Sequence, residues 1–200
     1  MTKIKICGLM CPADIEAVCK VRPDFAGSIL TPGFRRSVAR EQYREMNRML
    51  ADAGILRVGV FVNEPLRSLT GSFAEMLDLI QLHGDEDADY IAKLRGFTGA
   101  GIIKMFRLRS PADADAVNRS TADYVLLDSG TGTGKVFDWS LLSGITRPYF
   151  LAGGLTPENV GDAVRLLHPF AADVSSGVET DGRKDPEKIR QFAEIIRRTE

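Results

Sequence analysis

The chain has few of the residues that bind metal ions or form disulfides. It contains two histidines, His83 and His168, and three cysteines, Cys7, Cys11 and Cys19. All three cysteines lie near the start of the chain and no CxxC pair occurs, so their spacing fits neither a disulfide framework nor a zinc ribbon. We therefore expect free thiols in a reducing cytoplasm and no histidine cluster that holds zinc or iron.

Long hydrophobic runs and a strong net charge are also lacking. The first residues, MTKIKICG, contain no apolar stretch of the kind found in signal peptides, and no apolar run approaches the length of a membrane span. The formal net charge is −1, and the basic residues are spread along the chain apart from small clusters such as Arg35-Arg36. These features disfavour a nucleic-acid-binding protein and a membrane-associated protein.

Short apolar runs, by contrast, recur along the whole chain. Runs rich in Ile, Val, Leu and Phe begin near residues 3, 25, 57, 78, 101, 123, 148 and 171. Their spacing suits repeated strand–helix units, and the length of 200 residues is close to the lower limit for a barrel of eight such units. The pattern predicts an α/β fold, a (β/α)8 TIM barrel in which residues 1–200 form a single compact domain. An open doubly wound sheet remains the alternative.

Amphipathic stretches lie between the apolar runs. Their apolar residues repeat with a period near 3.6, and several begin with a capping residue followed by proline. Two further stretches, 64–73 and 137–142, predict weak or short helices. The stronger predicted helices are Pro12–Lys20, Val38–Ala53, Asp85–Arg95, Pro111–Arg119, Pro157–Leu167 and Asp185–Arg197.

Polar residues on the first and last strands are predicted to meet inside the barrel. Side chains alternate along a strand, so Lys5 and Cys7 share one face, and the interior suits a lysine better than the helix layer. The first and last strands are neighbours in a closed barrel, so we expect Lys5 to pair with Asp173. A lysine near Cys7 favours the thiolate and makes Cys7 a candidate base or nucleophile. The alternative for Cys7, and our expectation for Cys11 and Cys19, is a small buried hydrophobe.

Asp128 ends the sixth apolar run and is a candidate general acid. The alternative role is to cap the following turn. The glycine-rich run 130–134 is similar to a phosphate-binding loop only in part, because Val136 follows Lys135 where that motif requires Ser or Thr. We interpret residues 129–135 as a loop that closes over a ligand.

Small residues follow the seventh and eighth strands. Gly153 and Gly154 come after one run, and Ser175, Ser176 and Gly177 come after the next. Phosphate binding recurs at this place in TIM barrels, where backbone N–H groups approach the anion. The two loops predict a phosphorylated small-molecule substrate; two tight turns without a ligand are the alternative.

Three further residues are candidates for substrate binding. Arg36 follows the second strand, where its guanidinium can grip a carboxylate through two hydrogen bonds; a solvated basic turn is the alternative. Gln81 and His83 share a face of the fourth strand. His83 is a candidate ligand or acid, although a single histidine at a strand end more often bonds to a neighbour.

Taken together, these motifs resemble the phosphoribosylanthranilate isomerase family of tryptophan biosynthesis. The matching segments run in order from one end of the chain to the other. They are Lys5–Gly8, Arg57–Asn63, Gln81–Gly84, Leu127-Asp128, Gly134-Lys135, Phe137–Trp139, Leu151–Leu155, Pro157–Asn159 and Asp173–Glu179.

The resemblance implies a TIM-barrel enzyme that converts an aldose derivative into a ketose by an Amadori rearrangement, without a metal or organic cofactor. It places Cys7 at the general-base position, Asp128 at the general-acid position and Arg36 at the site of the anthranilate carboxylate. Gln81 and His83 would contact the substrate, and the two small-residue loops would bind its phosphate. A cytoplasmic monomer or homodimer is expected.

The chain departs from the family at Leu9–Cys11, on the second strand and at Gly33-Phe34. One rival prediction is therefore a non-catalytic binder of a phosphorylated metabolite, descended from the same family. Another is a different phosphate-binding barrel, such as a thiamine-phosphate synthase or a pentose-phosphate epimerase. Those enzymes need carboxylates for magnesium pyrophosphate or a set of metal ligands, and neither is evident in the sequence.

Overall fold

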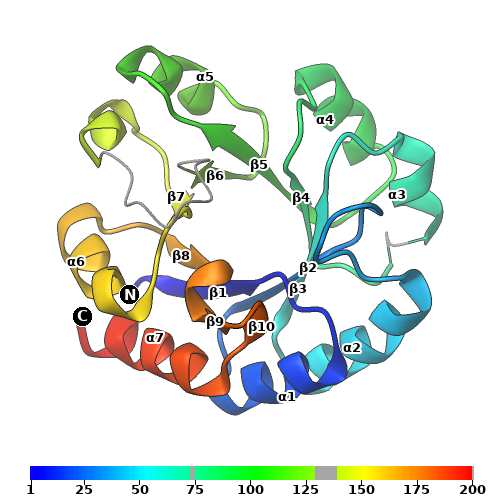
Figure 1. The fold of residues 1–200 in the computed structure, drawn as a ribbon. Helices are drawn as coiled ribbons and strands as arrows, with labels where there is room; N and C mark the ends of the chain where they lie inside the picture. The colour runs from blue at the N-terminus through cyan, green and yellow to red at the C-terminus, as the bar shows by residue number, and fades with distance from the viewer. Residues whose placement is uncertain (73–74, 129–138, 200) are drawn as a thin grey trace.

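Parallel strands form a closed barrel at the centre of the molecule (Figure 1). The computed structural model describes residues 1–72, 75–128 and 139–199. Each barrel strand begins within about one residue of its predicted start, and the closed order from β1 to β8 excludes the open sheet. The strands are β1 Lys3–Cys7, β2 Phe25–Ile29, β3 Leu56–Phe61, β4 Leu79–Leu82, β5 Gly101–Arg107, β6 Tyr124–Asp128, β7 Tyr149–Leu151 and β8 Ala171–Val174.

Helices surround the barrel and cover its outer face (Figure 1). They lie where the amphipathic pattern predicts them: α2, for example, buries Tyr43, Met46 and Leu50 on one stripe. In the described residues no helix is long and apolar enough to cross a membrane. The α-helices are α1 Pro12–Val21, α2 Arg40–Asp52, α3 Leu66–Ser72, α4 Ala88–Arg95, α5 Ala114–Asn118, α6 Pro157–Leu167 and α7 Pro186–Thr199.

Two predicted helices are partly or wholly replaced by 3₁₀ turns. The segment Pro111–Arg119 starts as a 3₁₀ turn, η1 Pro111–Asp113, before α5, because Asp113 caps the turn by accepting from the N–H groups of Arg109 and Ser110. After β6 the described chain resumes with a 3₁₀ helix, η2 Trp139–Gly144. The helix predicted at 137–142 is therefore a 3₁₀ helix over its described residues.

The barrel interior changes from apolar to polar along the strands. At the amino-terminal end Phe25, Tyr124, Phe150 and Phe170 pack ring against ring, with centroids 5.1–6.5 Å apart. The Lys3 ammonium closes this end, 5.6 Å from the centre of the Phe25 ring. This apolar layer excludes water from the amino-terminal end of the barrel. The polar residues of the interior lie beyond it, toward the carboxyl ends of the strands.

One element was not predicted from the sequence. After β8 the chain forms a short 3₁₀ turn, η3 Ser176–Val178, and then an antiparallel hairpin of β9 Glu179–Thr180 and β10 Arg183–Lys184. Asp181 and Gly182 form its turn, both with positive φ, as a two-residue hairpin turn requires. An Asp-Gly pair is a strong sequence signal for a two-residue hairpin turn. The hairpin could therefore have been predicted from the sequence.

Candidate active site

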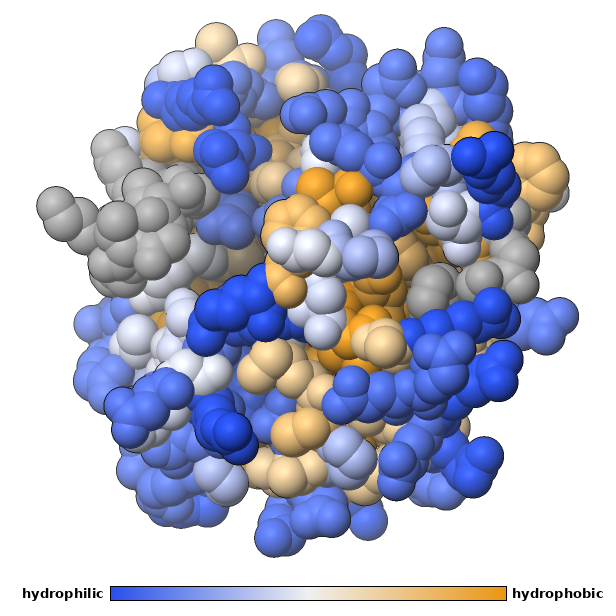
Figure 2. Space-filling view, turned by 45° about the vertical axis from the view of Figure 1, so that its right-hand side comes forward, coloured by the Kyte–Doolittle hydropathy of each residue, from blue (hydrophilic) through white to orange (hydrophobic). Residues whose placement is uncertain are grey.

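A cavity of about 380 Å³ opens at the carboxyl ends of the strands. Figure 2 shows hydrophobic residues gathered near the middle of one face, with hydrophilic residues over most of its periphery. Every site residue predicted from the sequence lines this cavity, although they come from strands and loops along the whole chain. The predicted residues are Cys7, Arg36, Gln81, His83, Asp128, Gly153, Gly154, Ser175, Ser176 and Gly177.

Cys7 lies at the end of β1, where its thiol faces the cavity and is 8% exposed. Gly27 is its register partner on β2, and a Cβ there would lie 2.8 Å from the Cys7 sulfur, so glycine makes room for the thiol. Below Cys7 the predicted pair is confirmed: the buried Lys5 ammonium donates to Asp173 at 2.8 Å.

Lys5 favours the Cys7 thiolate, as predicted, but burial of the thiol has the larger effect on its pKa. Burial raises the pKa of the Cys7 thiol, and the positive charge of Lys5, which acts in the opposite direction, does not overcome it. Asp173 neutralises much of that charge and itself raises the pKa of Cys7. Cys7 therefore rests as a thiol near neutral pH.

The raised pKa of Cys7 predicts slow alkylation at neutral pH. Only the thiolate reacts, so half-maximal labelling of Cys7 by iodoacetamide is expected above about pH 8.5, the ordinary value for cysteine. Mass spectrometry of the peptide that contains Cys7 measures this titration separately from Cys11 and Cys19. A midpoint below pH 8 would contradict the effect of burial.

Asp128 ends β6 beside His83, which directly follows β4. The Nε2 atom of His83 lies 3.8 Å from an Asp128 carboxylate oxygen, and Gln81 Nε2 lies 2.9 Å from His83 Nδ1. An amide nitrogen only donates, so Nδ1 accepts and the neutral ring carries its hydrogen on Nε2, facing Asp128. Burial lowers the pKa of His83 although Asp128 opposes the shift, so the ring is neutral near pH 7.

The two turns that were predicted to bind phosphate line the same cavity. Gly153 and Gly154 follow β7, and both have positive φ, which lets the chain turn sharply at the cavity wall. Asn159 of α6 holds this turn: its amide nitrogen donates to the Gly154 carbonyl at 2.9 Å, and its amide oxygen accepts from the Thr156 N–H at 2.9 Å. Ser176 and Gly177 of η3 line the same side of the cavity.

Gly177 packs so closely that we expect alanine there to destabilise the fold. A Cβ at this position would overlap the Leu155 carbonyl oxygen, which is rigid backbone. Gly177→Ala should lower the free energy of unfolding by about 1–3 kcal/mol, as overpacking does. Among the described residues, a Cβ at Gly99 meets no atom within 4 Å, so Gly99→Ala is the matched control.

Urea denaturation measures both glycine variants. The Gly99→Ala variant is expected to stay within about 0.5 kcal/mol of the wild type. Equal stability of Gly177→Ala and Gly99→Ala would show that the turn after β8 is not as tightly packed as the contact with Leu155 requires.

Arg36 donates two hydrogen bonds to a carboxylate, and this carboxylate is that of Glu179. Arg36 Nε donates to Glu179 at 2.7 Å and Nη2 donates at 2.8 Å. The sequence does not predict this contact, because nothing in the spacing pairs residues so far apart in the chain. Phe34, in one of the segments that depart from the family, lines the cavity, and so does Arg107, which no sequence motif marked.

One predicted part of the site, the loop at 129–135, lies outside the described residues. In the described parts of the chain, no group of three His, Cys, Asp or Glu side chains is arranged to hold a metal ion. The described site thus offers a thiol, a carboxyl group, an arginine and two glycine turns around one cavity. A thiol and a carboxyl group on one cavity are suited to acid–base chemistry.

Comparison with known proteins identifies the family of this chain. The family described as "N-(5'phosphoribosyl)anthranilate (PRA) isomerase" matches residues 4–195. The chain belongs to this family. A relative from Clostridium acetobutylicum, named N-(5'-phosphoribosyl)anthranilate isomerase, is 41% identical over 99% of both chains.

Solved structures of the isomerase family have the same fold. The phosphoribosyl anthranilate isomerase of Thermus thermophilus matches with a TM-score of 0.88 and 31% identity, covering 100% of both chains. A second isomerase, solved with reduced 1-(o-carboxyphenylamino)-1-deoxyribulose 5-phosphate, matches with a TM-score of 0.85 and 32% identity over 98% of this chain and 99% of that one. The family resemblance inferred from the motifs is confirmed.

Proposed function

We propose that the protein converts N-(5'-phosphoribosyl)anthranilate into 1-(2-carboxyphenylamino)-1-deoxyribulose 5-phosphate in tryptophan biosynthesis. The observation that carries this proposal is the meeting of Cys7, Asp128 and Arg36 on one cavity beside two glycine turns. The substrate has a phosphate at one end, a carboxylate at the other and a sugar ring between them. The site offers a complementary group for each part.

Binding starts with the two anions of the substrate. The phosphate lies against the turns at Gly153-Gly154 and Ser176-Gly177, where backbone N–H groups and the start of α6 favour negative charge. The anthranilate carboxylate binds Arg36. Because both ends of the substrate are bound, the ribose is held between Cys7 and Asp128. The reacting atoms are then already positioned beside both catalytic side chains.

Asp128 then acts as the general acid. Its carboxyl group donates a proton to the ribose ring oxygen, the bond from that oxygen to C1 breaks, and the nitrogen lone pair forms a Schiff base with C1. The neutral His83 ring lies 3.8 Å away with its Nε2 hydrogen toward Asp128, so it places no positive charge beside the acid. General acid catalysis of this kind contributes about 10²–10⁴-fold in rate.

Cys7 acts as the general base in the second step. The thiolate removes the proton from C2, and the electrons move toward the Schiff-base nitrogen to give an enolamine. A proton added at C1 and a proton lost from the C2 hydroxyl then give the ketone. Burial makes the thiolate scarce, but a base with a raised pKa is also a stronger proton acceptor once formed.

Growth without tryptophan tests the proposed reaction. A bacterial strain that lacks its own isomerase should grow on medium without tryptophan when it carries the wild-type gene. The Cys7→Ala gene, expressed to the same level, should not restore growth. Failure of the wild type, with soluble protein present, would favour the non-catalytic binder among the rival functions.

Three further properties belong to this proposal. We propose that residues 1–200 unfold as one domain, in a single cooperative transition. The protein works in the cytoplasm on a small phosphorylated substrate, as a monomer or a homodimer. A relative from Thermotoga maritima is described as a dimeric isomerase, so analytical ultracentrifugation is the direct measurement of the oligomeric state.

A further inference from the structure

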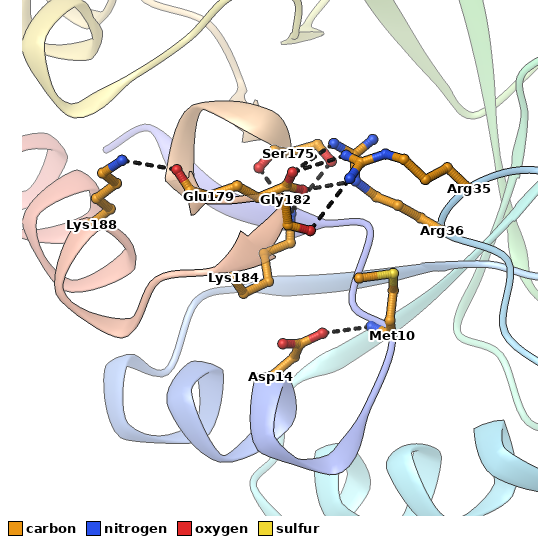
Figure 3. Close-up of polar contacts among 9 residues, drawn as sticks. All are labelled: Met10, Asp14, Arg35, Arg36, Ser175, Glu179, Gly182, Lys184 and Lys188. Atoms are coloured by element: carbon orange, nitrogen blue, oxygen red, sulfur yellow. Dashed lines mark hydrogen bonds and ion pairs between the residues drawn. The ribbon is translucent and has the colours of Figure 1, made fainter.

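Three basic side chains converge on the carboxylate of Glu179 at the start of β9 (Figure 3). Arg35 donates to it at 3.0 Å, Arg36 at 2.7 and 2.8 Å, and Lys184 at 2.9 Å. The Glu179 side chain is only 6% exposed, whereas that of Arg35 is 59% exposed. Arg36 and Lys184 are therefore the partners that matter energetically, because an exposed ion pair contributes little.

The contact with Glu179 leaves one edge of Arg36 available. A guanidinium has five N–H donors, and Glu179 takes the Nε hydrogen and one Nη2 hydrogen. Among the described residues, the Nη1 atom of Arg36 has no acceptor. The Nη1–Nη2 edge is itself a pair of parallel donors, so Arg36 can bind a second carboxylate without releasing Glu179.

The stem of Arg36 packs closely against Gly8, which follows β1. A Cβ on Gly8 would lie 2.8 Å from Arg36 Cδ and 2.7 Å from Ser175 Oγ, so only glycine leaves room for the stem at this point of the cavity wall. Packing thus fixes the path of the stem, but the plane of the guanidinium beyond it depends on a hydrogen-bond partner. Glu179 is that partner.

Lys184 connects this arrangement to the phosphate side of the cavity. Its side chain is fully buried, and its ammonium donates to Glu179 at 2.9 Å and to the Ser175 carbonyl at 2.8 Å. Ser175 directly precedes η3, whose Ser176 and Gly177 line the proposed phosphate site. The β9–β10 hairpin therefore fixes the carboxylate-binding group relative to the phosphate-binding turn.

From this geometry we propose that Glu179, held by Lys184, is a positioning residue that turns the Nη1–Nη2 edge of Arg36 toward the substrate carboxylate. This inference rests on the proposed function, because it assumes that Arg36 binds the anthranilate carboxylate. Glu179, Arg36 and Lys184 thereby determine specificity: they select ligands that carry an anion at the aromatic end as well as a phosphate.

Glu179 stays charged at neutral pH. Burial on its own raises the pKa of this carboxyl, but hydrogen bonds from Arg36, Lys184 and Arg35 outweigh it and hold the pKa at about 2. The anchor on Arg36 is therefore present throughout the neutral range.

Glu179 can affect ligand binding in two ways, by orienting Arg36 and by its own negative charge, and these two effects change the affinity in opposite directions. Removing the negative charge of Glu179 would by itself strengthen the binding of another anion nearby. Glu179→Asp keeps the charge but shortens the side chain by one methylene, so it cannot reach Arg36 and Lys184 together. If orientation matters most, both Glu179→Gln and Glu179→Asp weaken the binding of a carboxylate ligand.

Two ligands that differ by one group provide the test. One is reduced 1-(o-carboxyphenylamino)-1-deoxyribulose 5-phosphate, and the other is the same molecule without its ring carboxylate. Calorimetry should show about tenfold weaker binding of the carboxylate ligand to both Glu179 variants, the size expected for a lost charged hydrogen bond. The ligand without the carboxylate should bind within about twofold of the wild type.

Arg35→Gln is the matched control, since it removes an exposed partner of Glu179 that does not line the cavity. It should change neither affinity. Unchanged or tighter binding of the carboxylate ligand to the Glu179 variants would overturn the inference, and so would an equal loss for both ligands. Arg36→Gln tests the assumption beneath it: if that variant binds both ligands as the wild type does, the proposed role of Arg36 fails first.

Discussion

Replacing Cys7 with alanine is expected to lower kcat by about 10²–10⁴-fold, the usual contribution of a general base. The thiol is the proposed group that removes the C2 proton, and alanine leaves the cavity without a base at that point. Product formation from N-(5'-phosphoribosyl)anthranilate, followed by chromatography, measures the effect. Cys19→Ala is the matched control, because the Cys19 sulfur contacts the Met49 carbonyl outside the cavity.

The Cys7→Ala variant should still bind ligand. Arg36 and the two glycine turns are unchanged in it, so the reduced product analogue is expected to bind with nearly wild-type affinity. Turnover within twofold of the wild type would remove Cys7 from the mechanism. A loss of turnover that came with an equal loss of affinity would indicate a role in binding instead.

Replacing Asp128 with asparagine should also reduce kcat by about 10²–10⁴-fold, since an amide of the same shape has no acidic proton to give to the ribose oxygen. Steady-state turnover of the variant, with its fold checked by circular dichroism, measures this loss. Asp52→Asn is the matched control: Asp52 is exposed at the end of α2, away from the cavity. It should retain full activity.

Two results for Asp128→Asn would contradict its role as the general acid, and each points to a different alternative. Normal turnover in Asp128→Asn would mean that another group opens the ribose ring. Because His83 faces Asp128 at 3.8 Å, a shift of the pH profile with normal maximal turnover would move the acid role to His83. We expect a low maximal rate at every pH.

The barrel could be predicted from the sequence because each strand is recognisable from its own residues and their immediate neighbours. Apolar runs, capping prolines and the period of the helices depend only on neighbouring residues, so the strand starts were predicted to within about one residue. The Lys5–Asp173 pair followed from strand alternation and from the closure of the barrel. The same logic brought the site residues to one cavity, since polar residues at the ends of parallel strands meet there.

What the sequence could not predict depends on distance and burial. Lys5 is near Cys7, but whether its charge or the burial of the thiol prevails is decided by the surroundings, and burial prevails. The pairing of Arg36 with Glu179 requires the hairpin to meet the loop after β2, which no local pattern encodes. Lys184 belongs to no recognisable sequence motif, and only the structure shows that its side chain is buried between Glu179 and Ser175.

A crystal structure of this protein with reduced 1-(o-carboxyphenylamino)-1-deoxyribulose 5-phosphate tests the central claim most directly. The account expects C2 of the ligand beside the Cys7 sulfur, Asp128 within about 3.2 Å of the sugar oxygens, and the phosphate on the turns at Gly153-Gly154 and Ser176-Gly177. The ring carboxylate should lie on the Nη1–Nη2 edge of Arg36. A ligand bound in the opposite direction, with its phosphate on Arg36 and its C2 carbon away from Cys7, would contradict the proposed mechanism.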